Sequence, residues 1–134
     1  MTDLDKLKEA GKIAATVREY AKEVIKPGIT LLKATEMLEK KIYELGAEPA
    51  FPVTISLNNI AAHYAADIDD ETILSDQVIK VDVGAHVDGF IGDTAVTIDL
   101  SGKYTKLLEA TEEALENAVK IAKVGTKLGE IGKV

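Results

Sequence analysis

Two aspartates, Asp82 and Asp93, are the residues of this sequence whose type and spacing best suit metal chemistry. They lie in two stretches rich in branched and small residues, 78–87 and 90–100, which are joined across His86-Val87-Asp88-Gly89. Asp-Gly between two apolar runs is a strong signal for a β-hairpin. The pattern therefore predicts two antiparallel strands with one aspartate in each.

The alternation of side chains along the two strands predicts that both carboxylates lie on one face of the hairpin. Odd-numbered apolar residues share a face of the first strand, and the even-numbered residues 96–100 share a face of the second, so Asp82 and Asp93 both lie opposite the apolar faces. A four-residue loop would place the two aspartates directly opposite each other, and a two-residue loop at Asp88-Gly89 would make them diagonal neighbours. Either register brings both carboxylates within reach of one ion.

Adjacent carboxylates need compensation, because two such charges about 5 Å apart repel by roughly 3 kcal/mol at an effective dielectric constant near 20. A divalent cation, a nearby lysine or arginine, or a raised pKa on one aspartate would supply it, and simple solvation on an exposed face is a further alternative. The small residues Gly84, Gly92, Thr94 and Ala95 predict open space above the sheet. Because the sequence has no cysteine, a metal would be held by oxygen atoms and the two histidines, His63 and His86. Oxygen ligands with one imidazole suit manganese, iron, cobalt or zinc in a hydrolytic role.

The bulk composition indicates one globular domain over residues 1–134, with 46% apolar residues and no need of disulfides. A net charge of −7 with lysines interspersed among glutamates argues against a nucleic-acid partner. The amino-terminal residues are charged, and no apolar run reaches the length of a membrane span. We therefore expect a soluble cytoplasmic protein with no membrane partner.

Helices flank the hairpin on both sides. Thr2 and Asp5 form a capping-box pattern for a first helix that should end at Lys26-Pro27-Gly28. Thr30 should cap a second helix that ends at Gly46. The first helix should bury one stripe: Leu4, Leu7, Ala10, Ala14, Val17, Ala21 and Val24.

The remaining segments complete a mixed α+β pattern. Residues 53–57 read as a short strand that reaches a turn at Asn58-Asn59, a second short extended piece follows at 60–64, and the acidic stretch 65–77 reads as a solvated loop. A helix over 103–124 should stop at Gly125, and a further helix should begin at Thr126. The buried side of the long helix should comprise Leu108, Leu115, Ala118, Val119 and Ala122.

Three stretches, Ala50-Phe51-Pro52, residues 56–64 (SLNNIAAHY) and residues 80–95 (KVDVGAHVDGFIGDTA), resemble the methionine aminopeptidases, above all the type 2 enzymes of archaea and eukaryotes. This resemblance implies an α+β chain that forms half of a pita-bread fold, the creatinase/aminopeptidase architecture, with an antiparallel sheet and helices packed on one face. It also implies a two-metal centre that removes the amino-terminal methionine from peptides.

The resemblance assigns roles to four residues. Asp82 resembles the carboxylate that chelates one metal, and Asp93 resembles the one that bridges both. His63 resembles the catalytic histidine that contacts the substrate near the scissile bond, although it could also be a packed, hydrogen-bonded side chain. Phe51 resembles a wall of the methionine side-chain pocket, or is simple core. His86 matches no ligand position and is expected to be a loop or sheet-face residue.

The family's remaining metal ligands, one histidine and two glutamates, come from a second half that this sequence does not contain. We therefore expect a homodimer with weak or no peptidase activity, which binds up to two manganese, cobalt, iron or zinc ions if the dimer completes the site. One alternative is a half-enzyme that needs its other half as a separate chain. Others are a non-catalytic pita-bread-like module that binds peptides or proteins, and a designed or minimal half-fold scaffold.

Overall fold

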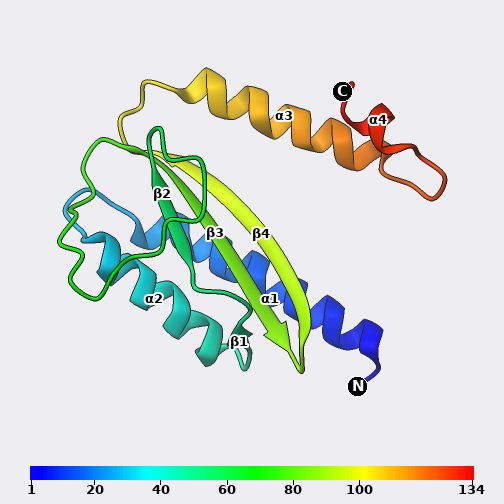
Figure 1. Cartoon of the computed structure of the whole chain (residues 1–134), viewed down its shortest axis with the longest axis horizontal. Helices are drawn as coiled ribbons and strands as arrows, with labels where there is room; N and C mark the ends of the chain where they lie inside the picture. The colour runs from blue at the N-terminus through cyan, green and yellow to red at the C-terminus, as the bar shows by residue number, and fades with distance from the viewer. The chain divides into compact units, whose positions relative to one another are not determined.

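The computed structural model describes residues 1–134 and divides them into two compact units. Unit 1 comprises residues 1–101 and contains helices α1 and α2 and strands β1 to β4 (Figure 1). Unit 2 comprises residues 102–134 and contains helices α3 and α4. Helices combined with an antiparallel sheet confirm the predicted α+β class. The single domain expected over 1–134 stays a prediction.

Helix α1 (Asp3–Val24) begins at the predicted capping box. The Asp5 N–H donates to the Thr2 hydroxyl at 3.2 Å, and the Thr2 N–H donates to the Asp5 carboxylate at 2.9 Å. These two bonds satisfy amide groups that the first turn would otherwise leave unpaired. The helix ends before Lys26-Pro27-Gly28, as predicted.

The predicted stripe of α1 is wrong in its first two turns. Leu4 and Leu7 are 58% and 47% exposed. Lys6 instead contacts the end of the hairpin. Its amino group lies 2.8 Å from the Asp88 carboxylate and 5.6 Å from the centre of the Phe90 ring, which brings its aliphatic stem against the hairpin. Further along, the helix buries Ala10, Ile13, Ala14, Val17 and Ala21.

Helix α2 (Leu31–Glu44) follows the prediction closely. The Thr30 hydroxyl accepts from the Lys33 N–H at 3.2 Å, and Gly46, just past the helix, has the positive φ of 83° that a glycine allows. The helix packs against α1 and the short strands. Its buried residues are Leu31, Ala34, Thr35, Leu38 and Ile42.

The sheet is built around β3 (Val78–Val87). Strands β1 (Glu48–Pro49) and β2 (Thr54–Leu57) pair with one side of β3, and β4 (Phe90–Asp99) pairs with the other side, all antiparallel. Asp88 and Gly89 between β3 and β4 both have positive φ, 49° and 84°, which is the geometry of a two-residue type I′ turn. This turn fixes the pairing register of the hairpin.

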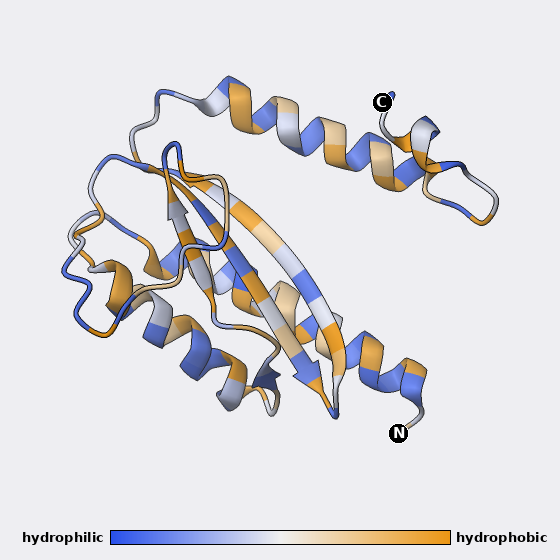
Figure 2. Cartoon of the chain, viewed as in Figure 1, coloured by the Kyte–Doolittle hydropathy of each residue, from blue (hydrophilic) through white to orange (hydrophobic).

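Helices α1 and α2 cover the core face of this sheet, which the odd-numbered residues of β3 build. Ile79, Val81, Val83 and Ala85 are fully buried there and pack against α1. The alternation is visible along β3 and β4, where hydrophobic and hydrophilic residues succeed each other (Figure 2). Pairing this apolar face with the helices leaves the even-numbered residues of β3 on the opposite face.

The extended piece predicted at 60–64 is a loop, not a strand. The Ile55 N–H donates to the Tyr64 carbonyl at 2.8 Å, and the Tyr64 N–H donates to the Ser56 hydroxyl at 3.3 Å, so the loop is fastened to β2 at one residue. His63 just before it has a φ of 65°, which breaks the extended path. The acidic loop that follows is largely solvated, as predicted, except that Leu74 is fully buried.

Gly92 on β4 lies against the backbone of α1, where a Cβ would collide with Ala10 and Gly11. Since backbone cannot move aside as a side chain can, we expect Gly92→Ala to lower the free energy of unfolding by about 1–3 kcal/mol. Gly11→Ala is the matched control, because its Cβ meets nothing within 4 Å, and it should stabilise the helix by up to about 1 kcal/mol. Urea unfolding of both variants measures the difference. Equal stabilities would contradict this packing.

Unit 2 contains α3 (Thr105–Ile121) and α4 (Leu128–Ile131). Helix α3 is shorter than the helix predicted over 103–124, and α4 begins two residues after the predicted start at Thr126. No residue of α3 is buried, so its predicted buried side is not found in this unit. Within unit 2, α4 has 4 residues and by itself is too short to cover a helix of 17. None of the helices combines the length and apolar composition needed to cross a lipid bilayer.

Candidate metal centre

The hairpin register makes Asp82 and Asp93 diagonal neighbours on one face. Asp82 pairs with Ala95, and Asp93 pairs with Gly84, which is the register expected for the two-residue loop. Directly paired residues point to the same face, and so do residues two apart on a strand, so both carboxylates lie on the face opposite the helices. The sequence therefore predicted the juxtaposition correctly and left only the choice between two registers open.

The environment of the pair holds the pKa of Asp82 above its usual value. Burial of this partly covered side chain is the main cause, the negative charge of Asp93 is the second, and a hydrogen bond to Asp93 adds to them. The charge of His63 opposes the shift. No lysine or arginine contributes, and Lys80 on the same face donates instead to the Asn58 carbonyl at 2.6 Å. Two of the predicted ways to relieve the repulsion between the carboxylates can therefore be judged: no basic side chain lies beside Asp82, and the pKa of Asp82 is raised.

Phe51 lies beside the pair. A Cβ at Gly84 would collide with the Phe51 ring, so this aromatic side chain covers the position between Asp82 and the turn. Phe51 is partly exposed. It thus forms a wall next to the carboxylates and is not a residue of the buried core.

Of the four small residues predicted to open space above the sheet, only two lie on the carboxylate face. Gly84 and Ala95 lie on the carboxylate face, but Phe51 fills the space above Gly84. Gly92 packs on α1 on the other face, and the Thr94 hydroxyl accepts there from Arg18 at 3.0 Å. Two of the four small residues therefore serve the contact between helix and sheet and leave no space for a ligand.

His63 joins the same face from the loop that is fastened to β2 at Tyr64. It is exposed, and it lies near enough to Asp82 for its charge to affect that carboxyl. Its left-handed backbone is uncommon for a residue with a side chain, and such conformations cluster at functional sites. The structure thus brings together all four residues that the sequence predicted for the site.

Thr54 is a neighbour of the site that the sequence analysis missed. It pairs directly with Asp82 in the register between β2 and β3. The alternation of the predicted strand 53–57 was a usable signal, because Val53 and Ile55 are fully buried and place Thr54 on the opposite, carboxylate face.

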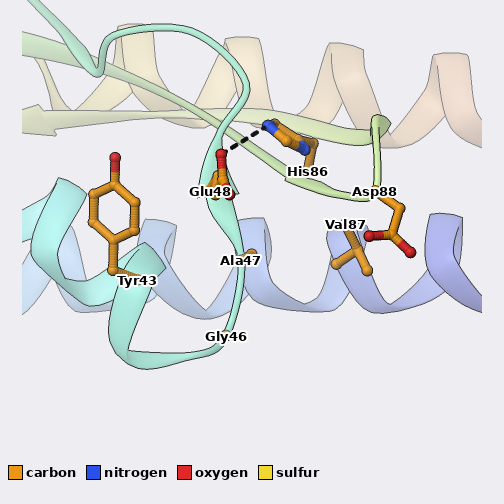
Figure 3. A pocket seen from close by; sticks show the side chains of 7 residues that line it. All are labelled: Tyr43, Gly46, Ala47, Glu48, His86, Val87 and Asp88. Atoms are coloured by element: carbon orange, nitrogen blue, oxygen red, sulfur yellow. Dashed lines mark ion pairs between the residues drawn. The ribbon is translucent and has the colours of Figure 1, made fainter.

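His86 lies away from the carboxylates, at the end of β3. Its Nδ1 accepts from the Gly89 N–H at 3.2 Å, and its Nε2 lies 3.8 Å from the Glu48 carboxylate (Figure 3). A pocket of about 370 Å³ adjoins this contact and contains neither Asp82 nor Asp93. Its lining residues are Tyr43, Gly46, Ala47, Glu48, His86, Val87 and Asp88. The side chain thus has structural partners at the hairpin turn, and it lies on the sheet as expected.

The donors present fit part of a metal site. Carboxylate oxygens suit hard divalent cations, and Asp82 and Asp93 offer four of them on one face. No group of three or more histidine, aspartate or glutamate side chains could hold an ion. Two five- or six-coordinate ions need roughly ten donor positions, so residues 1–134 supply a minority of the ligands for such a centre.

Comparison with known proteins agrees with this geometry. The model of metallopeptidase family M24 matches residues 5–134. The chain is 51% identical over 132 residues to the methionine aminopeptidase of Pyrococcus abyssi, covering 98% of this chain and 45% of that relative. It is 50% identical over 131 residues to that of Methanocaldococcus jannaschii, covering 97% and 45%. With the methionine aminopeptidase of Methanothermus fervidus, identity is 43% over 145 residues, covering 98% of this chain and 77% of that relative.

Solved structures give the same result. The methionine aminopeptidase of Thermotoga maritima superposes with a TM-score of 0.88 at 29% identity, covering 96% of this chain and 56% of that one. The methionine aminopeptidase of Rickettsia prowazekii gives 0.86 at 27% identity, covering 97% and 56%. These matches confirm the predicted half of a pita-bread fold. The chain spans about half the length of the first curated relatives it matches.

Proposed function

The chain belongs to metallopeptidase family M24 and corresponds to the amino-terminal half of the archaeal methionine aminopeptidases, and we propose that it supplies Asp82 and Asp93 to a two-metal centre that removes amino-terminal methionine from peptides. The activity is that of a complete pita-bread unit, of which these residues are one half. On its own, the 134-residue chain has weak or no peptidase activity, because it holds too few ligands.

The observation that carries this proposal is the diagonal pair of carboxylates. Burial and, after it, the negative charge of Asp93 raise the pKa of Asp82, and no basic side chain offsets the repulsion between the two carboxylates. A divalent cation between them converts this repulsion into attraction. Asp82 would be the ligand of one ion, and Asp93 would be a ligand for both.

Manganese, cobalt, iron or zinc, when bound, polarises the scissile carbonyl and lowers the pKa of a coordinated water. The chain's own residues do the rest. Asp82 and Asp93 would hold the ions on the sheet face opposite α1 and α2. His63 contacts the substrate next to the scissile bond, and Phe51 forms one wall of the pocket for the methionine side chain, beside Gly84.

A chimera tests the proposal. Residues 1–134 are joined to the part of the Pyrococcus abyssi enzyme that follows its matched segment, and release of methionine from a short peptide is measured with added Mn²⁺. The identity of 51% over the matched part makes the two halves compatible. We expect turnover that depends on both aspartates. A chimera that folds and binds Mn²⁺ but releases no methionine would contradict the proposal.

The free edge of β4 supports the predicted self-association. No strand pairs with the side of β4 that faces away from β3. Leu100, just after β4, donates its N–H to the Gln77 carbonyl at 3.0 Å, so even-numbered residues along β4 bond to β3 and odd-numbered residues direct their backbone groups outward. A long edge without lysine or proline is a template for strand pairing. A second copy could therefore extend the sheet and bring two aspartate pairs together.

Ala95→Pro tests this dimer, because it removes an outward N–H and leaves the bonds to β3 intact. We expect the wild-type chain to be a dimer by light scattering and the variant to be a monomer. Ala95→Val keeps the N–H and should stay dimeric. A wild-type chain that is folded and monomeric at micromolar concentrations would exclude self-association.

A further inference from the structure

Thr54 carries a polar group whose position is not explained by folding. Its side chain is 8% exposed and lies on the carboxylate face, directly paired with Asp82. Its Oγ1 atom is buried and has no hydrogen-bond partner. Buried polar atoms are almost always paired, because an unpaired one loses its hydrogen bonds to water and gains nothing in return.

The next hydroxyl on the same face of β2 shows the contrast. Ser56 is 1% exposed, yet its Oγ accepts from the Tyr64 N–H at 3.3 Å and so fastens the loop that carries His63. The Thr54 hydroxyl, in contrast, makes no hydrogen bond to any other segment. A valine would fill the same volume without an unpaired oxygen, so the hydroxyl at this position weakens the metal-free fold.

We propose that Thr54 is a positioning residue for Asp82: when a divalent cation is bound, its hydroxyl donates a hydrogen bond to the carboxylate of Asp82 and so orients this carboxylate toward the cation. The inference rests on the proposed role of Asp82 as a metal ligand. Directly paired residues have their Cβ atoms about 5 Å apart, so rotation about χ1 brings the hydroxyl within reach of the carboxylate.

A partner of this kind is what Asp82 lacks. No lysine or arginine acts on its carboxyl group, so no basic side chain orients this carboxylate. Hydrogen bonds to a ligating carboxylate orient it and raise metal affinity, and their loss typically weakens binding by about 10–100-fold. Thr54 is placed to give this support from the neighbouring strand.

Three variants separate positioning from structure. The wild-type chain, Thr54→Val, Thr54→Ser and Ser56→Ala are each titrated with Mn²⁺, with free Mn²⁺ followed by electron paramagnetic resonance, and each is unfolded thermally without metal. Thr54→Val should bind Mn²⁺ about 10–100-fold more weakly while the metal-free chain becomes as stable as the wild type or more so. Thr54→Ser should lose stability, because it loses a buried methyl group, yet bind Mn²⁺ almost as tightly as the wild type.

Ser56→Ala is the matched control, since its hydroxyl has a structural partner: it should lose stability and keep Mn²⁺ affinity. A purely structural Thr54 would make affinity follow stability in all three variants, which would overturn the inference. Wild-type affinity in Thr54→Val, or affinity lost in Thr54→Ser, would overturn it as well and leave the proposed function standing. A wild-type chain that binds no more Mn²⁺ than an Asp82→Asn, Asp93→Asn double variant would overturn both.

Discussion

Replacing Asp93 with asparagine is expected to weaken Mn²⁺ binding by at least about 100-fold, and at the same time to stabilise the metal-free chain. Binding should fall because the carboxylate proposed as a ligand for both ions loses its charge, and a 100-fold loss corresponds to about 2.7 kcal/mol. Stability rises because Asp82 no longer faces a second negative charge. Since Asp93 is exposed, solvent screening limits this gain to about 1 kcal/mol.

The sign of the pH dependence provides a check on the same variant. The folded chain holds the Asp82 proton more tightly than the unfolded chain, because the pKa of Asp82 is raised in the fold. The unfolded state therefore binds fewer protons between the usual and the raised pKa, and this residue's contribution to the free energy of unfolding falls as pH rises through that window. The stabilisation by Asp93→Asn should thus grow with rising pH and vanish in acid, where the Asp82 carboxyl is neutral in both states.

Asp88→Asn is the matched control for Asp93→Asn. The Lys6 amino group, 2.8 Å away, holds the pKa of Asp88 below its usual value, so this carboxylate favours the charged form in the fold. Removing the Asp88 charge by Asp88→Asn should leave Mn²⁺ affinity unchanged and should not stabilise the chain at neutral pH. If both variants change Mn²⁺ binding alike, the effect is one of net charge, and Asp93 is not a specific ligand.

Replacing His63 with alanine in the active chimera is expected to lower kcat/KM for a methionine-bearing peptide by about 100-fold or more, the usual effect of losing a positioned proton donor or acceptor at the reacting bond. The residue lies close enough to Asp82 to act electrostatically on it, and its backbone is held in a left-handed conformation by the loop fastened at Tyr64. Steady-state peptide hydrolysis at saturating Mn²⁺ measures the loss.

His86→Ala is the matched control, because this histidine bonds the Gly89 N–H and faces Glu48 at the other end of β3. It should leave kcat/KM close to that of the parent chimera. Mn²⁺ affinity should be unchanged in both variants, since neither histidine is a proposed ligand. Equal losses of activity in the two variants would show that His63 has no particular role at the reacting bond.

Local sequence patterns were sufficient to predict the hairpin that carries Asp82 and Asp93 and the ends of the two helices that cover its other face. The Asp-Gly turn and the period of two along the strands placed Asp82 and Asp93 on one face, and capping residues gave the ends of α1 and α2. These features depend on residues close in sequence, whose turn chemistry and alternation are readable directly. The remaining choice of register followed from the positive φ of Asp88 and Gly89.

Features that depend on contacts distant in sequence were not readable in this way. Gly92 looked like a residue that opens space for a ligand, but it allows α1 to approach the sheet, and only the helix position reveals this. The exposure of Leu4 and Leu7 likewise follows from the Lys6 contact with the hairpin. The roles of the site residues came from the resemblance to a family, because geometry alone identifies adjacent carboxylates and not their substrate.

Whether Asp82 and Asp93 together bind a metal can be seen in a crystal of the chain soaked with Mn²⁺, with data collected to locate manganese by its anomalous scattering. We expect an anomalous peak within coordinating distance of oxygens of both Asp82 and Asp93, on the sheet face opposite α1, and no such peak in Asp93→Asn. A strongest peak at Glu48 and His86 beside the hairpin turn, with none between the two aspartates, would contradict it.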